Sequence, residues 1–578
     1  MKKILLVVVV LIASGLRLFQ INQLSLTHDE MSIGYNAYSI VKTGKDEWGA
    51  KYPLVFRAFG DNKLPTYIYA SVPSIALLGL NGFAVKLPSI IAGLAVVIGI
   101  FVITQQIFEN WKMALLASFL MAINPWPIHL SRMAFESNLA LAFFIFGMYF
   151  WLTLHTNTQL ILHKQKKRLI GLILLFSLAT YTYISYRLLI PILLSVYLAL
   201  ACTKLFKKKS TLKSVLQSES WKIATITLVG VAILLIPFFT SSGSNSNTSR
   251  FSQLFKDQLQ GMHSLSTEQN NFCFLVEPKI LPYLCRRLYS PSINLLNNIF
   301  VNYATFLSPT TIFIKGDKLE YLSVPNFPDI LTVLLPFYWI GSVVWLQKNH
   351  RKYPMITWAW LLAPLPSALS GEPQIVRGSA LLPFIILFTT LGIHYCWRKL
   401  RLQTTKLLLS PKKSLLIVGM YLILFTFCWV SFAINYYLIY PKQYRSHFYQ
   451  LSQPVADYLW ENQAKYEKIY ITDDFPDAHI FLAFYGQVDP NWYQENVVRP
   501  PADDYSFQHP TQLGNFTFGP RLGDIVTNVN SSHWLYVTGP TDTIRYSKIF
   551  YGFSGVHGEV KITDVDLIRE QIKSLNLN

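Results

Sequence analysis

Charged side chains are scarce in this sequence. Only 14% of its 578 residues are Asp, Glu, Lys or Arg, while 52% are apolar. Soluble domains usually carry about 25% charged residues. Several apolar runs reach the roughly 20 residues that a helix needs to cross a bilayer. A soluble globular protein is therefore excluded, and the sequence predicts an α-helical polytopic membrane protein.

Acidic residues are fewer than basic residues, and the formal net charge is +19. From Pro441 to the end there are 11 basic and 16 acidic residues, so the excess of positive charge lies entirely in the first 440 residues. There the basic residues form short clusters between apolar runs, which is the pattern of cytoplasmic loops in membrane proteins. No domain carries a basic face interleaved with aromatic residues, and this excludes a nucleic-acid-binding protein.

Cysteine is also rare, with five residues in the chain, and this excludes a small disulfide-built scaffold. Cys202, Cys396 and Cys428 lie in or beside apolar runs and are predicted to pack as free thiols. Cys273 and Cys285 share a predicted outer loop, where an oxidising compartment would permit a bridge. The sequence leaves open whether that bridge forms.

The first apolar run has a basic start but lacks a clear small-residue cleavage site, so we expect an uncleaved first span over residues 4–21. Apolar runs and basic clusters together predict about eleven spans. This gives a multi-span membrane domain at residues 1–440, with outer loops at 22–86 and 240–328. We expect a multi-pass protein of the bacterial plasma membrane with its N-terminus in the cytoplasm.

Residues 441–578 change in character and predict a soluble α/β domain outside the cytoplasm. "EKIYITDD", "SHWLYVTG" and "GEVKITDVD" have the composition of strands, and "HFYQLSQPVADYLWENQ" has helical spacing. Asp473, Asp474 and Asp477 follow the first strand and either hold a cation or solvate a loop. The "DVD" at residues 564–566 is too short to indicate a metal site, and we expect neither a metal nor a cofactor.

The motif "LTHDEMSIGYNAYSIVKTGKDEW" places two acidic residues directly after the first span. Thr27 and Glu30 have the spacing of a capping box, so Glu30 either caps a helix or takes part in catalysis. Asp29 has no such structural role beyond favouring a helix N-terminus, and it could act as a general base toward an acceptor hydroxyl.

Other candidate charged residues also lie at outward helix ends or in outer loops. Lys63 and Arg377 either take part in a site at the outer surface or lie at the interface as snorkelling side chains. Arg187 either reaches the same site or anchors a helix end. Asp61 either orients Lys63 or belongs to a turn beside Gly60.

Two further arginines have open roles. Arg132 and Glu136 have i,i+4 spacing, so they either pair with each other or serve a site at the outer surface. Arg17, at the end of the first span, is expected to snorkel to the interface. None of these positions suggests a mid-membrane ion path, which would favour a transporter.

The sequence resembles the GT-C-type glycosyltransferases that use polyprenyl-phosphate sugars, especially protein O-mannosyltransferases and bacterial aminoarabinose–lipid A transferases. The resemblance covers most of the membrane half and rests on the acidic motif above together with a set of short stretches. These are "FRAFGDNKLPTYIYASVP", "NPWPIHLSRMAFESN", "TYTYISYR", "FLSPTTIFIKGD" and "LPSALSGEPQIVRGSALLP". Within "KLPTYIY", Leu64 replaces the first proline of the family's pattern.

The resemblance implies that Asp29 is the catalytic carboxylate, with Glu30 beside it. It also implies that Lys63 and Arg377 hold the donor phosphate. Arg187 or Arg132 could help them, and Asp61 and Glu136 would support the site. The expected partners are a polyprenyl-phosphate-sugar donor, a hydroxyl acceptor of unknown class and membrane lipids. Positive charge at the leaving phosphate and one activating carboxylate suit an inverting displacement.

Two other classes stay open on the sequence alone. One is a polytopic transporter or flippase for lipid-linked saccharides, in which the acidic pair would gate entry. The other is a non-catalytic membrane scaffold whose outer domain binds partners. A transporter would be favoured by paired halves with broken spans, and we find no such pairing in the sequence.

Overall fold

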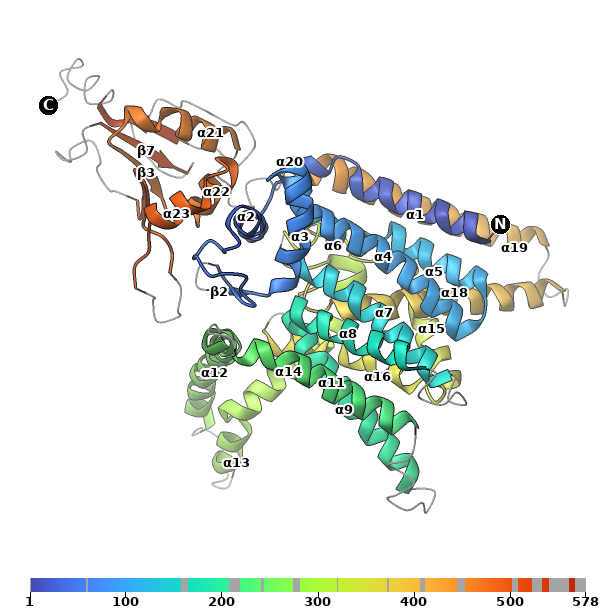
Figure 1. The fold of residues 1–578 in the computed structure, drawn as a ribbon. Helices are drawn as coiled ribbons and strands as arrows, with labels where there is room; N and C mark the ends of the chain where they lie inside the picture. The colour runs from blue at the N-terminus through green and yellow to red at the C-terminus, as the bar shows by residue number, and fades with distance from the viewer. Residues whose placement is uncertain are drawn as a thin grey trace. The chain divides into compact units, whose positions relative to one another are not determined.

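The protein is mostly helical and has one mixed sheet near its C-terminus (Figure 1). The structure is a computed structural model. It describes residues 2–58, 61–156, 165–206, 219–240, 244–273, 281–319, 321–371, 374–405, 411–443, 453–501, 508–521, 533–539 and 561–566. Its internal contacts divide the chain into two compact units, Met1–Phe19 with Ser89–Ala433 and Gln20–Pro88 with Ile434–Asn578.

The first of these, which we call the helical unit, consists of long apolar helices and shorter connecting ones. Its helices are α1 (Lys2–Leu18), α4 (Gly82–Phe108, entering from the other unit), α5 (Trp111–Ile123), α6 (Pro125–Arg132), α7 (Glu136–Thr156), α8 (Lys166–Thr182), α9 (Ile184–Phe206), α11 (Glu219–Thr240), α12 (Ser244–Cys273), α13 (Leu281–Leu288), α14 (Pro291–Leu307), α15 (Leu335–Lys348), α16 (Pro354–Leu362), α17 (Leu365–Leu369), α18 (Leu382–Thr405) and α19 (Pro411–Ile434).

Small residues let two of these helices approach closely. A Cβ atom on Gly341 of α15 would lie 1.7 Å from the carbonyl oxygen of Phe388 in α18. A Cβ atom on Gly392 of α18 would lie 1.9 Å from the carbonyl oxygen of Phe337 in α15. Any larger side chain at either position would push the helices apart, as expected for helices that associate inside a membrane.

Six helices among the described residues are long and apolar enough to cross a membrane, or seven if the pair α5 and α6, bent by 58°, forms one span. This confirms a multi-span membrane protein, while the predicted count of about eleven stays a prediction. The apolar run at residues 354–369 is divided between α16 and α17. That division shows why apolar length alone overestimates continuous helices.

The second unit, which we call the sheet unit, joins the segment after α1 to the C-terminal part of the chain. Its elements are α2 (His28–Thr43), β1 (Phe56–Ala58), β2 (Asp61–Lys63), α3 (Pro65–Leu78), α20 (Tyr440–Gln443), α21 (Gln453–Asn462), β3 (Lys468–Thr472), α22 (Ala478–Tyr485), α23 (Pro490–Asn496), β4 (Val497–Val498), β5 (Gln512–Leu513), β6 (Phe516–Gly519), β7 (Trp534–Thr538) and β8 (Lys561–Asp564).

The sheet has six strands in the order β4-β5-β6-β3-β7-β8. Strand β3 is parallel to both β6 and β7, and the remaining pairs are antiparallel. Four of the five residues of β3 are buried, as expected for a central strand. The three strands predicted from sequence correspond to β3, β7 and β8, and the predicted helix overlaps α21, with its first part outside the described residues.

The N-terminal segment and the C-terminal domain pack together within the sheet unit. Helix α2 contacts α3, α22 and α23, and the Tyr35 hydroxyl donates to the Val488 carbonyl at 3.1 Å. A Cβ atom on Gly34 would lie 2.7 Å from the Phe484 ring, so glycine permits this approach. Residues 22–86 therefore group with the C-terminal domain, whereas the sequence assigned them to a domain at 1–440.

Cys273 at the end of α12 forms a disulfide with Cys285 in α13. This answers the question that the sequence left open. Cys202, Cys396 and Cys428 are free thiols, as predicted.

Candidate active site

The start of helix α2 presents the acidic pair. Thr27 is the N-cap, and both hydrogen bonds of the capping box are present. The Thr27 hydroxyl accepts from the Glu30 N–H at 3.2 Å, and the Glu30 carboxylate accepts from the Thr27 N–H at 2.8 Å. Glu30 is only 2% exposed, so its side chain is committed to starting the helix.

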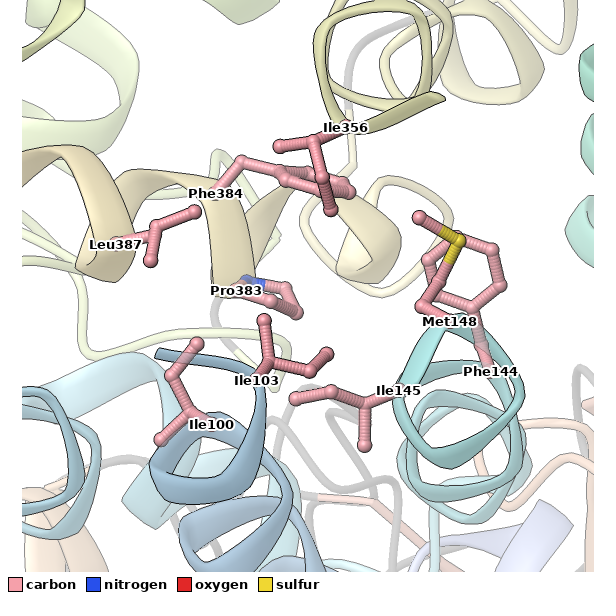
Figure 2. A pocket seen from close by; sticks show the side chains of 9 residues that line it. All are labelled: Ile100, Ile103, Phe144, Ile145, Met148, Ile356, Pro383, Phe384 and Leu387. Carbon is pink, nitrogen blue, oxygen red and sulfur yellow. The ribbon is translucent and has the colours of Figure 1, made fainter. Parts of the chain in front are cut away.

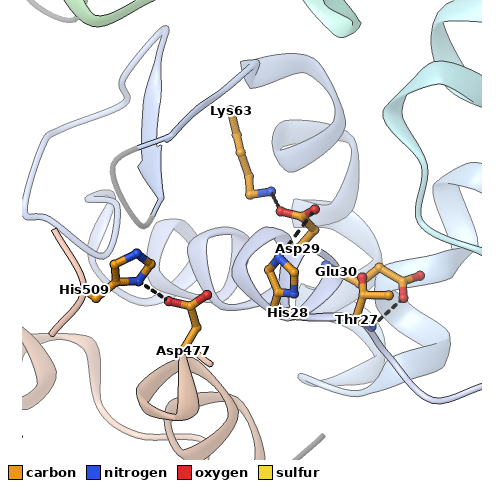
Figure 3. Close-up of polar contacts among 7 residues, drawn as sticks. All are labelled: Thr27, His28, Asp29, Glu30, Lys63, Asp477 and His509. Atoms are coloured by element: carbon orange, nitrogen blue, oxygen red, sulfur yellow. Dashed lines mark hydrogen bonds and ion pairs between the residues drawn. The ribbon is translucent and has the colours of Figure 1, made fainter. Parts of the chain in front are cut away.

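Asp29 points away from this cap and meets Lys63 (Figure 3). The Lys63 ammonium donates to Asp29 Oδ1. Side-chain exposure is 55% for Asp29 and 6% for Lys63. A buried ammonium needs a counter-charge, and here the counter-charge keeps most of its surface open to solvent. In this pair the carboxylate is open to solvent, and the positive charge beside it is buried and held in place.

Local backbone structure holds Lys63 in place. Strands β1 and β2 form a hairpin in which Phe56 pairs with Lys63, and Pro65 then begins α3 at its first turn. Asp61 pairs with Ala58 through the same hairpin, and its side chain lies outside the described part of the chain. The predicted role of Asp61 in orienting Lys63 therefore stays a prediction.

Two carboxylates of the sheet unit, those of Asp29 and Asp477, each face a histidine side chain. Nε2 of His28 lies 3.8 Å from Asp29 Oδ2. Nδ1 of His509 lies 2.8 Å from Oδ1 of Asp477 (Figure 3). Burial alone would raise the pKa of Asp477, but the hydrogen bond from His509 and the charges of His479, His509 and His28 lower it overall.

Asp477 has a backbone conformation that is rare for a non-glycine residue, with φ of 57°. It occupies the N-cap position of α22 without a side-chain capping bond. Its carboxylate instead faces His509, and its side chain is 8% exposed. The sequence left open whether residues 473, 474 and 477 hold a cation or solvate a loop, and the side chains of Asp474 and Asp477 are instead mostly buried and paired within the sheet unit. The Asp474 carboxylate accepts from Thr538 Oγ1 at 3.0 Å and the Gly539 N–H at 2.9 Å.

Arg377 belongs to the helical unit, in the segment between α17 and α18. Its Nη1 donates to the Ser370 carbonyl at 3.0 Å, and the side chain is half-buried. Asp317 Oδ2 accepts the Ile375 N–H at 2.8 Å and so holds the same segment. The pKa of Asp317 is raised overall because burial outweighs two opposing effects. These are the hydrogen bonds from backbone amides and the charge of Arg377, which lower it.

Arg132 and Arg17 both donate hydrogen bonds to backbone carbonyls of the helical unit. The Arg132 guanidinium donates to the carbonyls of Leu16, Arg17 and Phe19 at the end of α1. Glu136 opens α7. Arg17 was expected to snorkel, and this is wrong: it is 0% exposed and donates to the carbonyls of Ala13, Ala122 and Pro127 and to the Ser131 hydroxyl. Of these acceptors, the Ala122 carbonyl lies in the last turn of α5, where backbone carbonyls lack an intrahelical partner.

Arg187 lies at the junction of α8 and α9. Its Nε donates to the Thr180 carbonyl at 2.8 Å, and its guanidinium lies 3.5 Å from the centre of the Phe238 ring. These contacts fit the anchoring role that the sequence left open.

An apolar pocket lies in the helical unit, among α4, α7, α16 and α18 (Figure 2). Ile100, Phe144, Met148 and Phe384 are among the nine side chains that line it, and all nine are apolar. Such a lining offers no group for acid, base or phosphate chemistry. Among the described residues, no group of three or more His, Cys, Asp or Glu side chains could hold a metal ion.

The chain was compared with models of protein families and with curated proteins. Residues 63–218, about a quarter of the chain, match the model of the family described as dolichyl-phosphate-mannose-protein mannosyltransferase. No curated protein matches the chain.

Solved structures that resemble the chain include the oligosaccharyltransferase AglB from Archaeoglobus fulgidus, in complex with an inhibitory peptide and a dolichol-phosphate. It has a TM-score of 0.48 and 12% identity over 84% of this chain and 63% of its own, so the chain spans less than two thirds of that protein. ArnT from Cupriavidus metallidurans bound to undecaprenyl phosphate has a TM-score of 0.38 and 11% identity over 97% of both chains.

The family match includes Lys63 and the helices that follow it, and it agrees with the resemblance predicted from the acidic motif and the outer-loop stretches. Residues 63–218 of this chain are therefore similar in sequence to the dolichyl-phosphate-mannose-protein mannosyltransferases.

Proposed function

We propose that this protein transfers a sugar from a polyprenyl-phosphate-linked donor to an acceptor hydroxyl on the outer face of the membrane. The observation that carries the proposal is the pairing of a solvent-open Asp29 with a buried Lys63. The family's name includes a lipid-phosphate sugar donor, and this supports the donor class. The basic clusters among the first 440 residues support placement of the acidic motif outside the cytoplasm.

In the proposed reaction Asp29 is the general base. It takes the proton from the acceptor hydroxyl while the acceptor oxygen forms a bond to the anomeric carbon. The bond between that carbon and the phosphate oxygen breaks, and its electron pair leaves with the polyprenyl phosphate. Attack from the face opposite the phosphate inverts the anomeric configuration, by analogy with inverting hydrolysis.

Lys63 supplies fixed positive charge for the departing phosphate. The charge is already in place before the reaction because Asp29 and the hairpin hold the side chain. Preorganised charge of this kind lowers the barrier without costly rearrangement. When the donor phosphate binds, the Lys63 ammonium can shift from Asp29 toward a phosphate oxygen. The Asp29 carboxylate then becomes more basic because it loses part of its positive partner.

Arg377 is our second candidate for holding the donor phosphate. Its guanidinium can bind two phosphate oxygens at once, and its segment is kept in place by Asp317 and Ser370. We assign Arg17, Arg132 and Arg187 to the helix framework, because their hydrogen bonds end on backbone carbonyls and a buried hydroxyl.

The test is sugar transfer by Asp29→Asn in membranes that contain the full-length protein and a labelled polyprenyl-phosphate sugar. We expect transfer to fall by about 10²–10⁴-fold, the usual contribution of a general base. Donor lipid should still bind, since the lysine remains. Asp473→Asn, which changes an exposed carboxylate, is the matched control. A transporter would instead move lipid-linked sugar without forming a glycosylated product.

A further inference from the structure

A short turn between α2 and β1 buries two carboxylates. Oδ1 of Asp46 accepts the N–H groups of Trp48 and Ala50 at 2.9 and 2.8 Å, so Asp46 shapes the turn. Glu47, next to it, is 2% exposed. A buried carboxylate is costly unless it is hydrogen-bonded or paired, so the surroundings of Glu47 are informative.

Glu47 is held through its backbone, and its side chain is only partly satisfied. Its N–H donates to Oδ1 of Asn36 at 3.0 Å, and its carbonyl accepts from Nη2 of Arg499 at 3.4 Å. Across the described ranges, its Oε2 atom has no hydrogen-bond partner. The turn itself does not require a carboxylate at this position, because Asp46 already provides the turn's hydrogen bonds.

Arg499 brings the C-terminal domain to this turn. Its guanidinium carbon lies 3.8 Å from the centre of the Trp48 ring and 5.7 Å from that of Tyr493. Gln494 adds a second tie, since its side-chain amide donates to the Asp46 carbonyl at 2.9 Å. The turn between α2 and β1 is therefore fixed by two residues from a distant part of the chain.

The pKa of Glu47 is raised to about 7, mainly by burial and further by the charge of Asp46. The charge of Arg499, the hydrogen bond with Asn36 and the charge of Lys63 act in the opposite direction and lower the pKa. The carboxylate therefore changes its charge near neutral pH. The titratable and charged groups that face it are Asp46 in its own turn, Lys63 in β2, Tyr35 in α2, Tyr493 in α23 and Arg499 after β4.

We propose that Glu47 is a positioning residue for the donor lipid, and that its buried carboxylate sets how strongly Lys63 attracts the donor phosphate. The proposal rests on the proposed function, in which Lys63 binds that phosphate. Lys63 and Glu47 interact electrostatically, and such interactions act equally on both partners. An ionised Glu47 competes with the phosphate for Lys63 and also repels the phosphate directly.

The direction of the pH effect follows from this arrangement. As the pH rises through about 7, Glu47 loses its proton and gains a negative charge. A phosphodiester donor carries the same single negative charge throughout this range. Donor affinity should therefore fall by several-fold between about pH 6 and about pH 8, one unit on either side of the Glu47 midpoint.

The experiment measures binding of a labelled probe, the methyl diester of a polyprenyl phosphate, to the full-length protein in lipid nanodiscs at both pH values. In Glu47→Gln the affinity should stay high and equal at both pH values. Glu495→Gln removes an exposed carboxylate from α23 and should keep the wild-type dependence. Donor KM in a transfer assay should follow the binding data, while kcat keeps one pH profile in wild type and Glu47→Gln.

A second variant tests the link to the C-terminal domain. Arg499→Met removes the charge that most favours ionised Glu47, so the midpoint of the binding curve should move to higher pH. Arg57→Met is its control, because Arg57 also faces the Trp48 ring, at 5.8 Å, but is exposed.

Parallel pH curves for wild type and Glu47→Gln, or a wild type whose probe binding is absent or independent of pH, would overturn the inference. A purely structural Glu47 would change thermal stability and leave the pH slope of binding in place. Failure of the proposed function would look different: probe binding would keep its Glu47-dependent slope, but no sugar would be transferred by the wild-type protein.

Discussion

Two buried basic residues, Lys63 in the sheet unit and Arg17 in the helical unit, meet partners of opposite kinds. In the sheet unit, Lys63 is buried against Asp29, and the carboxylate remains 55% exposed. In the helical unit, Arg17 is fully buried, and its donors end on three carbonyls and a hydroxyl. A charge that meets one open partner is available to a substrate, whereas a charge surrounded by backbone acceptors holds helices together.

This comparison also separates two adjacent acidic residues. Glu30 is closed into a capping box, and Asp29 is turned toward Lys63. Neighbours in a helix point about 100° apart, so the same motif serves both the fold and the site.

The largest effect that sharpens the comparison is expected from Lys63→Met. This variant keeps a long side chain in the buried site but removes the charge that faces the donor phosphate. We expect kcat/KM for the donor to fall by about 10²–10³-fold, typical of losing one preorganised charge. Steady-state transfer with varied donor is the measurement. An unchanged donor KM and kcat would place the phosphate elsewhere.

Arg17→Met should affect stability and leave chemistry alone. Removing the guanidinium leaves the acceptors at Ala13, Ala122, Pro127 and Ser131 without it. We expect a loss of about 3 kcal/mol in the free energy of unfolding. Thermal unfolding in detergent measures the loss, and transfer per folded molecule should stay at the wild-type level. A selective loss of transfer would give Arg17 a role in the site.

The sequence predicted local features well and long-range ones poorly. The capping box at Thr27 and the strands β3, β7 and β8 depend on residues near each other in the chain, and all are present. The joining of α2 to the C-terminal domain depends on contacts such as Tyr35 with Val488, more than 450 residues apart. No periodicity carries that information.

The same limit applies to the candidate site. Asp29 and Lys63 could be proposed from their motifs, and their pairing within one unit agrees with that proposal. Glu47 and Arg499 were missed as site residues because their importance comes from burial and from partners in distant segments. Asp477 was considered as a cation ligand or a loop residue, but not as the partner of His509. The one available signal was a second Asp-Glu pair, in "TGKDEWG", inside a short loop.

His479 should make the sheet unit sensitive to acid. Burial lowers its pKa to about 3, below that of the unfolded chain, so protons bind first to the unfolded state. Stability is therefore complete above about pH 6.5 and is lost as the pH falls, by roughly 1.4 kcal/mol per unit at most. His479→Gln should flatten this dependence between about pH 4 and 6 in thermal unfolding. An identical slope in the variant would contradict it.

Glu30→Gln should have the smallest effect, because glutamine also completes a capping box. We expect transfer to fall by less than about threefold and stability by less than about 1 kcal/mol. If this variant instead lost transfer as severely as Asp29→Asn, the distinction between the capping and the reacting carboxylate would be lost.

The most direct test of the contrast is one measurement of single-turnover sugar transfer, normalised to folded protein, for Asp29→Asn and Arg17→Met side by side. We predict that the Asp29 variant is at least about a hundredfold slower than wild type and that the Arg17 variant equals wild type. Equal losses in the two variants, or full activity in Asp29→Asn, would contradict the assignment of the exposed pair to chemistry and the buried arginine to structure.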